Sequence, residues 1–258
     1  MEKNFKVTYI VPVHEYNDEV EKYLTRALKS LTVQDSAEDY EVFFVGKLDI
    51  LTKCQEVAKK VDVPQIVTLV PTDEEDIFEK INIAASKCHT DYFSVLEFDD
   101  AFYPYWNKVA QSYLSEKEYS VLLPMNENTR TDGTVPTLGN EIAWDAAFVN
   151  DLGHITKDEL LVYKDFNVTG AYIKTKDFID FGKLKSKLKI AAWYEFLLNV
   201  VDNGGTIFVA PRIGYIHTVL REGSYMVKCQ SELTTEEAIT LINEATKAHK
   251  PKEEKKEE

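Results

Sequence analysis

Short apolar runs alternate with amphipathic stretches through the first half of the chain. Apolar, β-branched runs predict five strands, at residues 6–12, 40–45, 65–70, 91–98 and 119–123. Apolar positions at helical spacing predict the intervening helices, around residues 20–31, 52–61, 72–87 and 101–114. Asn17 or Asp18 is the expected N-cap of the first helix. The alternation predicts an α/β fold with a mostly parallel sheet and right-handed crossovers.

The second half is less regular. Residues 125–165 carry turn signals and few clear strands, which is typical of a lid or a binding loop. Further strands are expected at 167–174, 206–210 and 213–217, and helices at 191–201 and 234–248. The last helix opens with a Thr-x-Glu-Glu start signal at Thr234. Without a repeat or a Gly/Ser linker, we expect one domain over 1–249 and a disordered charged tail over 250–258.

Charge and cysteine usage exclude several classes of protein. The formal net charge is −14, which argues against a nucleic-acid-binding surface and against docking on anionic lipid through a basic patch. The three cysteines form no Cys-x-x-Cys pair, so neither a disulfide framework nor a zinc site is expected. No apolar run is long enough for a signal peptide or a transmembrane segment. These features predict a protein of a reducing, cytoplasmic compartment.

Candidate chemistry gathers where the predicted strands end. In open α/β sheets, ligands bind beyond the carboxyl ends of the strands. That rule selects four segments, which are 14–15, 46–47, 71–72 and 97–100. In the last of them, strand alternation places Glu97 and Asp99 on one side, and Asp100 begins the turn. Such carboxylates can hold Mn²⁺ or Mg²⁺ on a diphosphate, or else Asp100 caps a helix and the other two are solvated.

Two longer stretches carry a family resemblance. Residues 7–34 read VTYIVPVHEYNDEVEKYLTRALKSLTVQ, a strand ending in Val-Pro-Val, a polar turn and a helix that closes on Leu-x-Ser-Leu-x-x-Gln. Residues 82–100 read NIAASKCHTDYFSVLEFDD and are followed by Pro104. Over 6–104 their order and spacing resemble the family 2 glycosyltransferases, and the resemblance is weaker over 167–224. It implies a GT-A-like, Rossmann-like sandwich, the fold of nucleotide-diphospho-sugar transferases.

The resemblance also implies roles for the residues at matching positions. Pro12, Val13 and His14 would line the nucleotide pocket. Glu97 and Asp99 stand at the positions of the family's Asp-x-Asp motif, so they would bind the metal ion and the phosphates of the sugar nucleotide.

Two later residues are less specific. His217 falls near a phosphate or metal contact of related enzymes, so it is a third candidate metal ligand; it is equally consistent with a histidine satisfied at a strand end. Arg221 suits a phosphate contact, as a bidentate donor, or a surface ion pair.

The sequence departs from the family at two motifs. After the second strand, the family's Asp-Asp-Gly-Ser segment is replaced by residues 45–49, VGKLD. In the late helix, the Glu-Asp pair that carries the general base is replaced by residues 192–195, AWYE. Glu195 is the best candidate for a catalytic base, provided that it reaches the acceptor hydroxyl; otherwise it is a surface residue.

These observations leave two main functions open. The first is a metal-dependent inverting glycosyltransferase that moves a sugar from a nucleotide-sugar donor to an unknown acceptor. The second is a catalytically degenerate relative that serves as a binding or structural module with a partner in a larger assembly. A nucleotidyltransferase with a similar metal-dependent sheet is a more distant alternative.

Overall fold

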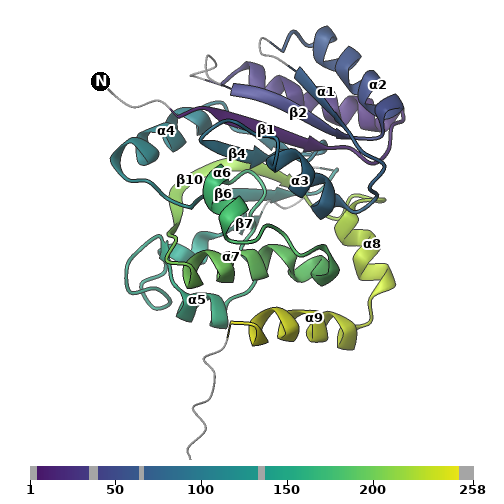
Figure 1. Cartoon of the computed structure of the whole chain (residues 1–258). Coiled ribbons are helices and arrows are strands. Elements are labelled where there is room, and N and C mark those ends of the chain that lie inside the picture. Colours follow the sequence, from purple (N-terminus) through teal and green to yellow (C-terminus); the bar gives the residue numbers. More distant parts are fainter. Residues whose placement is uncertain (1–4, 35–39, 64–66, 133–136, 250–258) are drawn as a thin grey trace, which may run out of the picture.

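The strands form one extended sheet. The computed structural model describes residues 5–34, 40–63, 67–132 and 137–249. In this part of the chain ten strands pair in the order β3-β2-β1-β4-β9-β6-β10-β5, with β7 beside β6 and β8 beside β10 (Figure 1). The strands are β1 (Val7–Pro12), β2 (Tyr40–Gly46), β3 (Val67–Pro71), β4 (Tyr92–Val95), β5 (Ala101–Phe102), β6 (Val121–Thr129), β7 (Thr137–Gly139), β8 (His154–Ile155), β9 (Tyr172–Lys174) and β10 (Ile207–Thr218).

Most neighbouring strands in the first half run parallel. β3, β2, β1 and β4 pair in parallel, and so do β6 and β10. β9 lies antiparallel between β4 and β6, so β4 and β6 again point the same way. The predicted α/β class with a mostly parallel central sheet is therefore confirmed. The carboxyl ends of β1 to β4 meet at one edge of the sheet.

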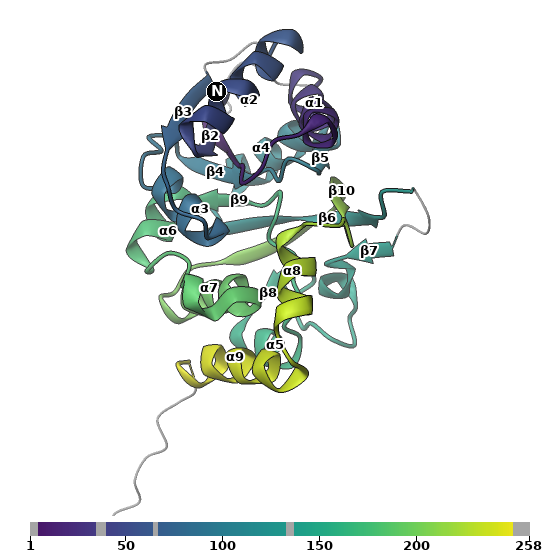
Figure 2. The same cartoon turned by 90° about the vertical axis from the view of Figure 1, so that its right-hand side faces the viewer.

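Helices cover both faces of the sheet (Figures 1 and 2). The α-helices are α1 (Asp18–Thr32), α2 (Leu48–Lys60), α3 (Ile77–Ala85), α4 (Trp106–Glu116), α5 (Lys157–Val162), α6 (Thr175–Asp180), α7 (Ala192–Asp202), α8 (Tyr225–Glu232) and α9 (Thr235–Lys247), and the 3-10 helices are η1 (Glu141–Trp144) and η2 (Ser186–Ala191). Helices α1, α2 and α4 pack on one face, while α3, α6 and α7 pack on the other. Strand alternation divides the core accordingly, because Tyr9 joins the first layer and its neighbour Ile10 joins the second.

Local capping signals place several helix starts. Asn17 caps α1 through its side chain, and Thr234 and Glu237 form the expected capping box of α9. The start predicted at residues 72–73 is wrong, because α3 begins at Ile77. The Asp76 side chain accepts hydrogen bonds from the first backbone N–H groups of that helix.

Long-range pairing overrides two other expectations. Ala101 and Phe102 do not start a helix but form β5, which pairs with Ile216 and Tyr215 of β10. The two short strands expected at 206–210 and 213–217 are one strand, β10, whose pairing with β6 is irregular near Ile213. Residues 137–162 are not weakly structured, since they contain β7, η1, β8 and α5.

Two further expectations concern the ends of the chain and the membrane. The predicted tail at 250–258 lies outside the described residues. Within the described ranges, no helix combines the length and the apolar character that crossing a bilayer requires.

Candidate active site

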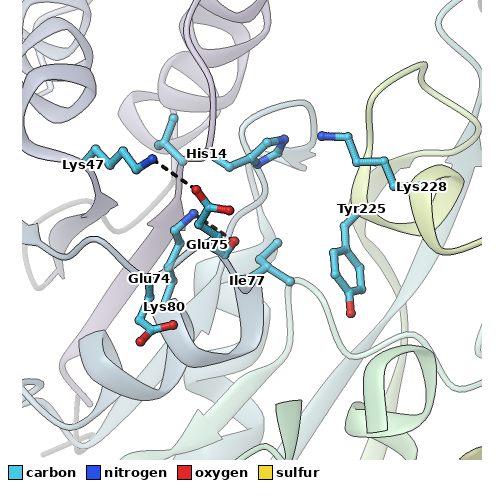
Figure 3. Close-up of a pocket in the computed structure, with 9 residues that line it drawn as sticks. His14, Lys47, Glu74, Glu75, Ile77, Lys80, Tyr225 and Lys228 are labelled. Carbon is cyan, nitrogen blue, oxygen red and sulfur yellow. Dashed lines mark hydrogen bonds and ion pairs between the residues drawn. The ribbon is translucent and has the colours of Figure 1, made fainter. Parts of the chain in front are cut away.

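A cavity of about 250 Å³ opens at the carboxyl edge of the parallel strands. We call it the cleft, and it is bounded by the ends of β1 and β2, the segment that leads into α3, and α8 (Figure 3). Its lining residues are Val13, His14, Lys47, Glu74, Glu75, Ile77, Lys80, Tyr225 and Lys228. The cleft lies where the strand-end rule predicts a ligand.

Backbone hydrogen bonds fix the floor of the cleft. The N–H of Val13 donates to the carbonyl of Val45 at 2.9 Å, which carries the pairing of β1 and β2 past the end of β1. The N–H of Thr72 donates to the carbonyl of Gly46, also at 2.9 Å. A Cβ atom on Gly46 would lie 2.3 Å from the Val13 carbonyl oxygen, so only glycine allows this approach. His14 and Lys47, the residues that come next in the sequence after Val13 and Gly46, both line the cleft.

Three lysines bring positive charge to the cleft. Lys47 forms an ion pair with Glu75 at 3.3 Å. Lys80, on α3, is only 3% exposed, and its Nζ donates to the carbonyl oxygen of Glu75 at 3.3 Å. Burial lowers the pKa of Lys80, and the neighbouring charge of Lys47 lowers it further. On the far wall, Lys228 extends from α8 toward His14 (Figure 3).

His14 lines both the cleft and a smaller cavity described below. Its Nε2 is buried, has no hydrogen-bond partner among the described residues, and lies 3.4 Å from Oε1 of Glu15. Burial lowers the pKa of His14 to about 4, against an opposing effect of Glu15. The imidazole is therefore neutral at pH 7.

A separate narrow cavity of about 10 Å³, which we call the extension, lies toward the end of β4 and shares His14, Ile77 and Tyr225 with the lining of the cleft. It is lined by Pro12, His14, Ile77, Glu97, Phe98, Asp99, Arg221, Ser224 and Tyr225. Every candidate nucleotide-binding residue from the sequence, namely Pro12, Val13, His14 and Glu97, thus borders the cleft or the extension. Their function as nucleotide ligands stays a prediction.

The acidic corner at the end of β4 is organised by cationic partners. Asp99 is 3% exposed, and its Oδ2 accepts a hydrogen bond from Arg221 Nε at 2.6 Å. Asp100 is fully buried, and it accepts from the backbone N–H of Thr218 at 2.7 Å and pairs with His217 Nδ1 at 3.0 Å. Burial, together with the neighbouring charges of Asp100 and Asp99, raises the pKa of Glu97 to about 8.

The side chains of this corner do not fit a resident Mn²⁺ or Mg²⁺. The predicted ligands were Glu97, Asp99 and His217, but Asp99 binds Arg221 and His217 binds Asp100. In the described part of the chain, no three His, Cys, Asp or Glu side chains are grouped so that they could hold a metal ion. His217 is also absent from the lining of the cleft and the extension. A divalent cation at this corner stays a prediction of the sequence.

Glu195, the candidate catalytic base, lies elsewhere. It is fully buried on α7 and borders neither the cleft nor the extension. Its Oε1 accepts hydrogen bonds from Asn199 Nδ2 at 3.0 Å and from Lys185, and it lies 3.1 Å from His249 Nε2. Those partners connect Glu195 to the segment before η2 and to the segment after α9, and its function as a catalytic base stays a prediction.

Sequence reasoning missed Lys80, Tyr225 and Lys228. A signal for Lys80 was present in the sequence, because this lysine interrupts the apolar face of a predicted helix, and lysine is rarely buried without a partner. No comparable signal marked α8, whose one buried residue is Cys229.

A third cavity, of about 450 Å³, lies at the opposite edge of the sheet. Its lining includes Tyr92, where β4 begins, together with His89 and Lys174. It is larger than the cleft, but it faces the amino ends of the parallel strands, where ligands of such sheets do not bind. We therefore regard the cleft as the candidate active site.

A sequence model of the family described as Glycosyl transferase family 2 matches residues 8–175. A search among curated proteins gave no match.

Several solved structures of S. aureus TarS have the same fold. The fragment 1–349 in complex with UDP-GlcNAc is 21% identical, with a TM-score of 0.68 over 96% of this chain and 68% of that chain. The same fragment in complex with UDP is 19% identical, with a TM-score of 0.62 over 95% of this chain and 71% of that chain. A longer TarS chain is 18% identical, with a TM-score of 0.60, and 43% of its length is covered. Together with the family match, the agreement identifies the fold as GT-A.

Proposed function

Because this chain belongs to glycosyl transferase family 2, we propose that it binds a nucleoside-diphosphate sugar in the cleft and transfers the sugar to an acceptor hydroxyl. In such a transfer the acceptor oxygen bonds to the anomeric carbon and the bond from that carbon to the diphosphate oxygen breaks. The electron pair stays on the diphosphate, and the hydroxyl proton is released.

The observation that carries the proposal is the charge of the cleft. The chain as a whole has a net charge of −14, yet the cleft is lined by three lysines against two glutamates, Glu74 and Glu75, and Arg221 borders the extension beside Glu97 and Asp99. A cleft with a local excess of cations attracts an anionic ligand, and a diphosphate fits that requirement. Its position beyond β1 to β4 supports the same ligand.

Uridine nucleotides are the first donors to test, because TarS has been crystallised with UDP-GlcNAc and with UDP. The experiment measures thermal unfolding and titration calorimetry of the purified chain with UDP, GDP, UDP-GlcNAc and UDP-glucose. We expect at least one of these ligands to bind.

The matched variants are Lys80→Met, inside the cleft, and Lys29→Met, on an exposed position of α1. Lys80→Met should lower the affinity for the bound nucleotide about tenfold or more, while Lys29→Met should leave it unchanged. Absence of binding by every nucleotide, or equal effects of the two variants, would contradict the proposal.

A second function is favoured by one observation, which is the burial of Glu195 away from the cleft. The segment that stands in place of the family's Glu-Asp pair, residues 192–195, carries a single carboxylate, that of Glu195. A chain that binds the donor without activating an acceptor would be a binding module.

Release of UDP from the donor separates the two functions. A transferase hydrolyses its donor slowly in water and faster with a suitable acceptor, so a coupled assay detects UDP above the uncatalysed rate. Tight donor binding without any UDP release would favour the binding module.

A further inference from the structure

The extension contains a guanidinium where the fold leads one to expect a metal ion. Arg221 is 6% exposed and follows β10, and its Nε donates to Asp99 Oδ2 at 2.6 Å. Its Nη1 donates to the carbonyl of Glu222 at 3.0 Å and to Glu15 Oε1 at 3.4 Å. The guanidinium carbon lies 4.8 Å from the centre of the Phe98 ring. Segments that follow β1, β4 and β10 thus fix the position of Arg221.

We infer that Arg221, rather than a divalent cation, provides the positive charge that meets the donor's diphosphate at the acidic corner. The inference rests on the proposed function, because it names the group that would bind the phosphates. Asp99 and Glu15 would then be positioning residues that hold the guanidinium.

The hydrogen bonds of Arg221 leave one nitrogen of its guanidinium group without a partner among the described residues. Nε and Nη1 have partners, whereas Nη2 has none among the described residues. Arg221 borders the extension together with His14 and Ser224. A planar guanidinium that is held on one side is suited to donate to a phosphate oxygen with its remaining N–H groups.

A metal ion would compete with this arrangement. To ligate Asp99, it would have to break the 2.6 Å contact with Arg221 and leave a buried guanidinium without its closest carboxylate. Removing one partner of a buried ion pair is strongly unfavourable. Asp100 offers no alternative ligand, because its two oxygens already meet Thr218 and His217.

The test compares UDP binding in EDTA with UDP binding in Mn²⁺ by titration calorimetry, using uridine as the ligand without phosphates. For the unsubstituted chain, we expect dissociation constants for UDP that agree within about twofold in the two buffers. Arg221→Gln should weaken UDP about tenfold or more in EDTA and leave the affinity for uridine unchanged. Arg212→Gln is the matched control, because Arg212 is exposed and its Nη1 donates to the Pro211 carbonyl.

Arg221→Lys provides a second variant in case Arg221→Gln does not fold. It keeps a positive charge beside Asp99 and should lose affinity for UDP by about threefold. If the binding of UDP needs Mn²⁺, or strengthens tenfold in its presence, the inference is wrong and the proposed function stands. If UDP, GDP and the nucleotide sugars all fail to bind in either buffer, both are wrong.

Discussion

Lys80 is deeply buried. Among the described residues, no carboxylate lies within ion-pair distance of its ammonium group. Its ammonium has a carbonyl partner, on Glu75, and it faces a cleft that two further lysines share. Burying a charge in this way costs free energy that packing alone does not explain. The anionic ligand that we propose for the cleft would offset this cost.

Substitution of Lys80 should therefore change affinity and stability in opposite directions. In Lys80→Met a side chain of similar length removes the buried charge, so we expect the thermal midpoint to stay constant or to rise by a few degrees. The same variant should bind UDP at least tenfold more weakly. A Lys80→Met protein with both properties reduced would show instead that Lys80 supports the fold.

His14 makes the stability of the protein depend on pH. Because its pKa falls from 6.5 in the unfolded chain to about 4 in the folded protein, the unfolded chain binds the proton first on acidification. The contribution of His14 to the free energy of unfolding is fully present above pH 6.5, the pKa of His14 in the unfolded chain. It is lost as the pH falls toward about 4, the pKa of His14 in the folded protein. From pH 7 to pH 5 the loss is about 2 kcal/mol.

The measurement is thermal unfolding of the unsubstituted chain and of His14→Gln at both pH values. His14→Gln should lose about 4–8 °C less between pH 7 and pH 5 than the unsubstituted chain does. Equal losses in the two proteins would mean that His14 titrates normally in the folded state.

At the scale of elements, Glu195 and His249 hold α7 and α9 together. His249 lies 3.1 Å from Glu195 Oε1 through Nε2 and 2.7 Å from Asp202 Oδ2 through Nδ1. Lys185 adds a contact from the segment before η2. Glu195 Oε2 has no hydrogen-bond partner among the described residues, so the contacts of this network converge on Oε1. Removal of Oε1 would leave buried polar groups unpaired.

Glu195→Ala should destabilise the protein by about 3 kcal/mol, because it leaves Lys185 without its carboxylate and the buried Nε2 of His249 without its partner. The folded fraction should bind UDP as tightly as the unsubstituted chain. Denaturant unfolding and titration calorimetry measure the two quantities. Unchanged stability together with loss of donor turnover would restore Glu195 as a catalytic residue.

The junction of β1 and β2 depends on Gly46. Gly46→Ala places a methyl group 2.3 Å from the Val13 carbonyl oxygen, so the two strand ends must separate. We expect a loss of about 3 kcal/mol, or roughly 6–12 °C in thermal midpoint, and weaker binding of UDP. Gly204→Ala is the control, since Gly204 also has a positive φ, of 77°, but has open space around its Cβ position. Equal losses in both variants would attribute the effect to backbone strain alone.

Elements with a strong local pattern were predictable from the sequence. The strands β1, β2 and β4 and the capped starts of α1 and α9 follow from apolar runs and capping residues. The pair β5–β10 was not, because it joins residues 101–102 to 215–216 and no local signal reports such a distant partner. α8 was missed since it buries only Cys229 and lacks an apolar stripe.

At the scale of the whole molecule, the parallel sheet brings the four predicted segments to one edge. Topology made that prediction possible, because the carboxyl ends of parallel strands meet regardless of the side chains that follow them. The partners of those side chains were not predictable. Arg221 reaches Asp99 across 122 positions of sequence, so the choice between a phosphate contact and an ion pair needed coordinates. In the structure it forms the ion pair, and it borders the extension as well.

Diffraction from a crystal of this chain soaked with UDP shows whether the cleft binds the diphosphate of a sugar nucleotide. We predict density for the nucleotide in the cleft, with phosphate oxygens within hydrogen-bond distance of Lys80 Nζ and of Arg221. Density for UDP at the opposite edge of the sheet, beside His89 and Lys174, with an empty cleft would contradict the claim.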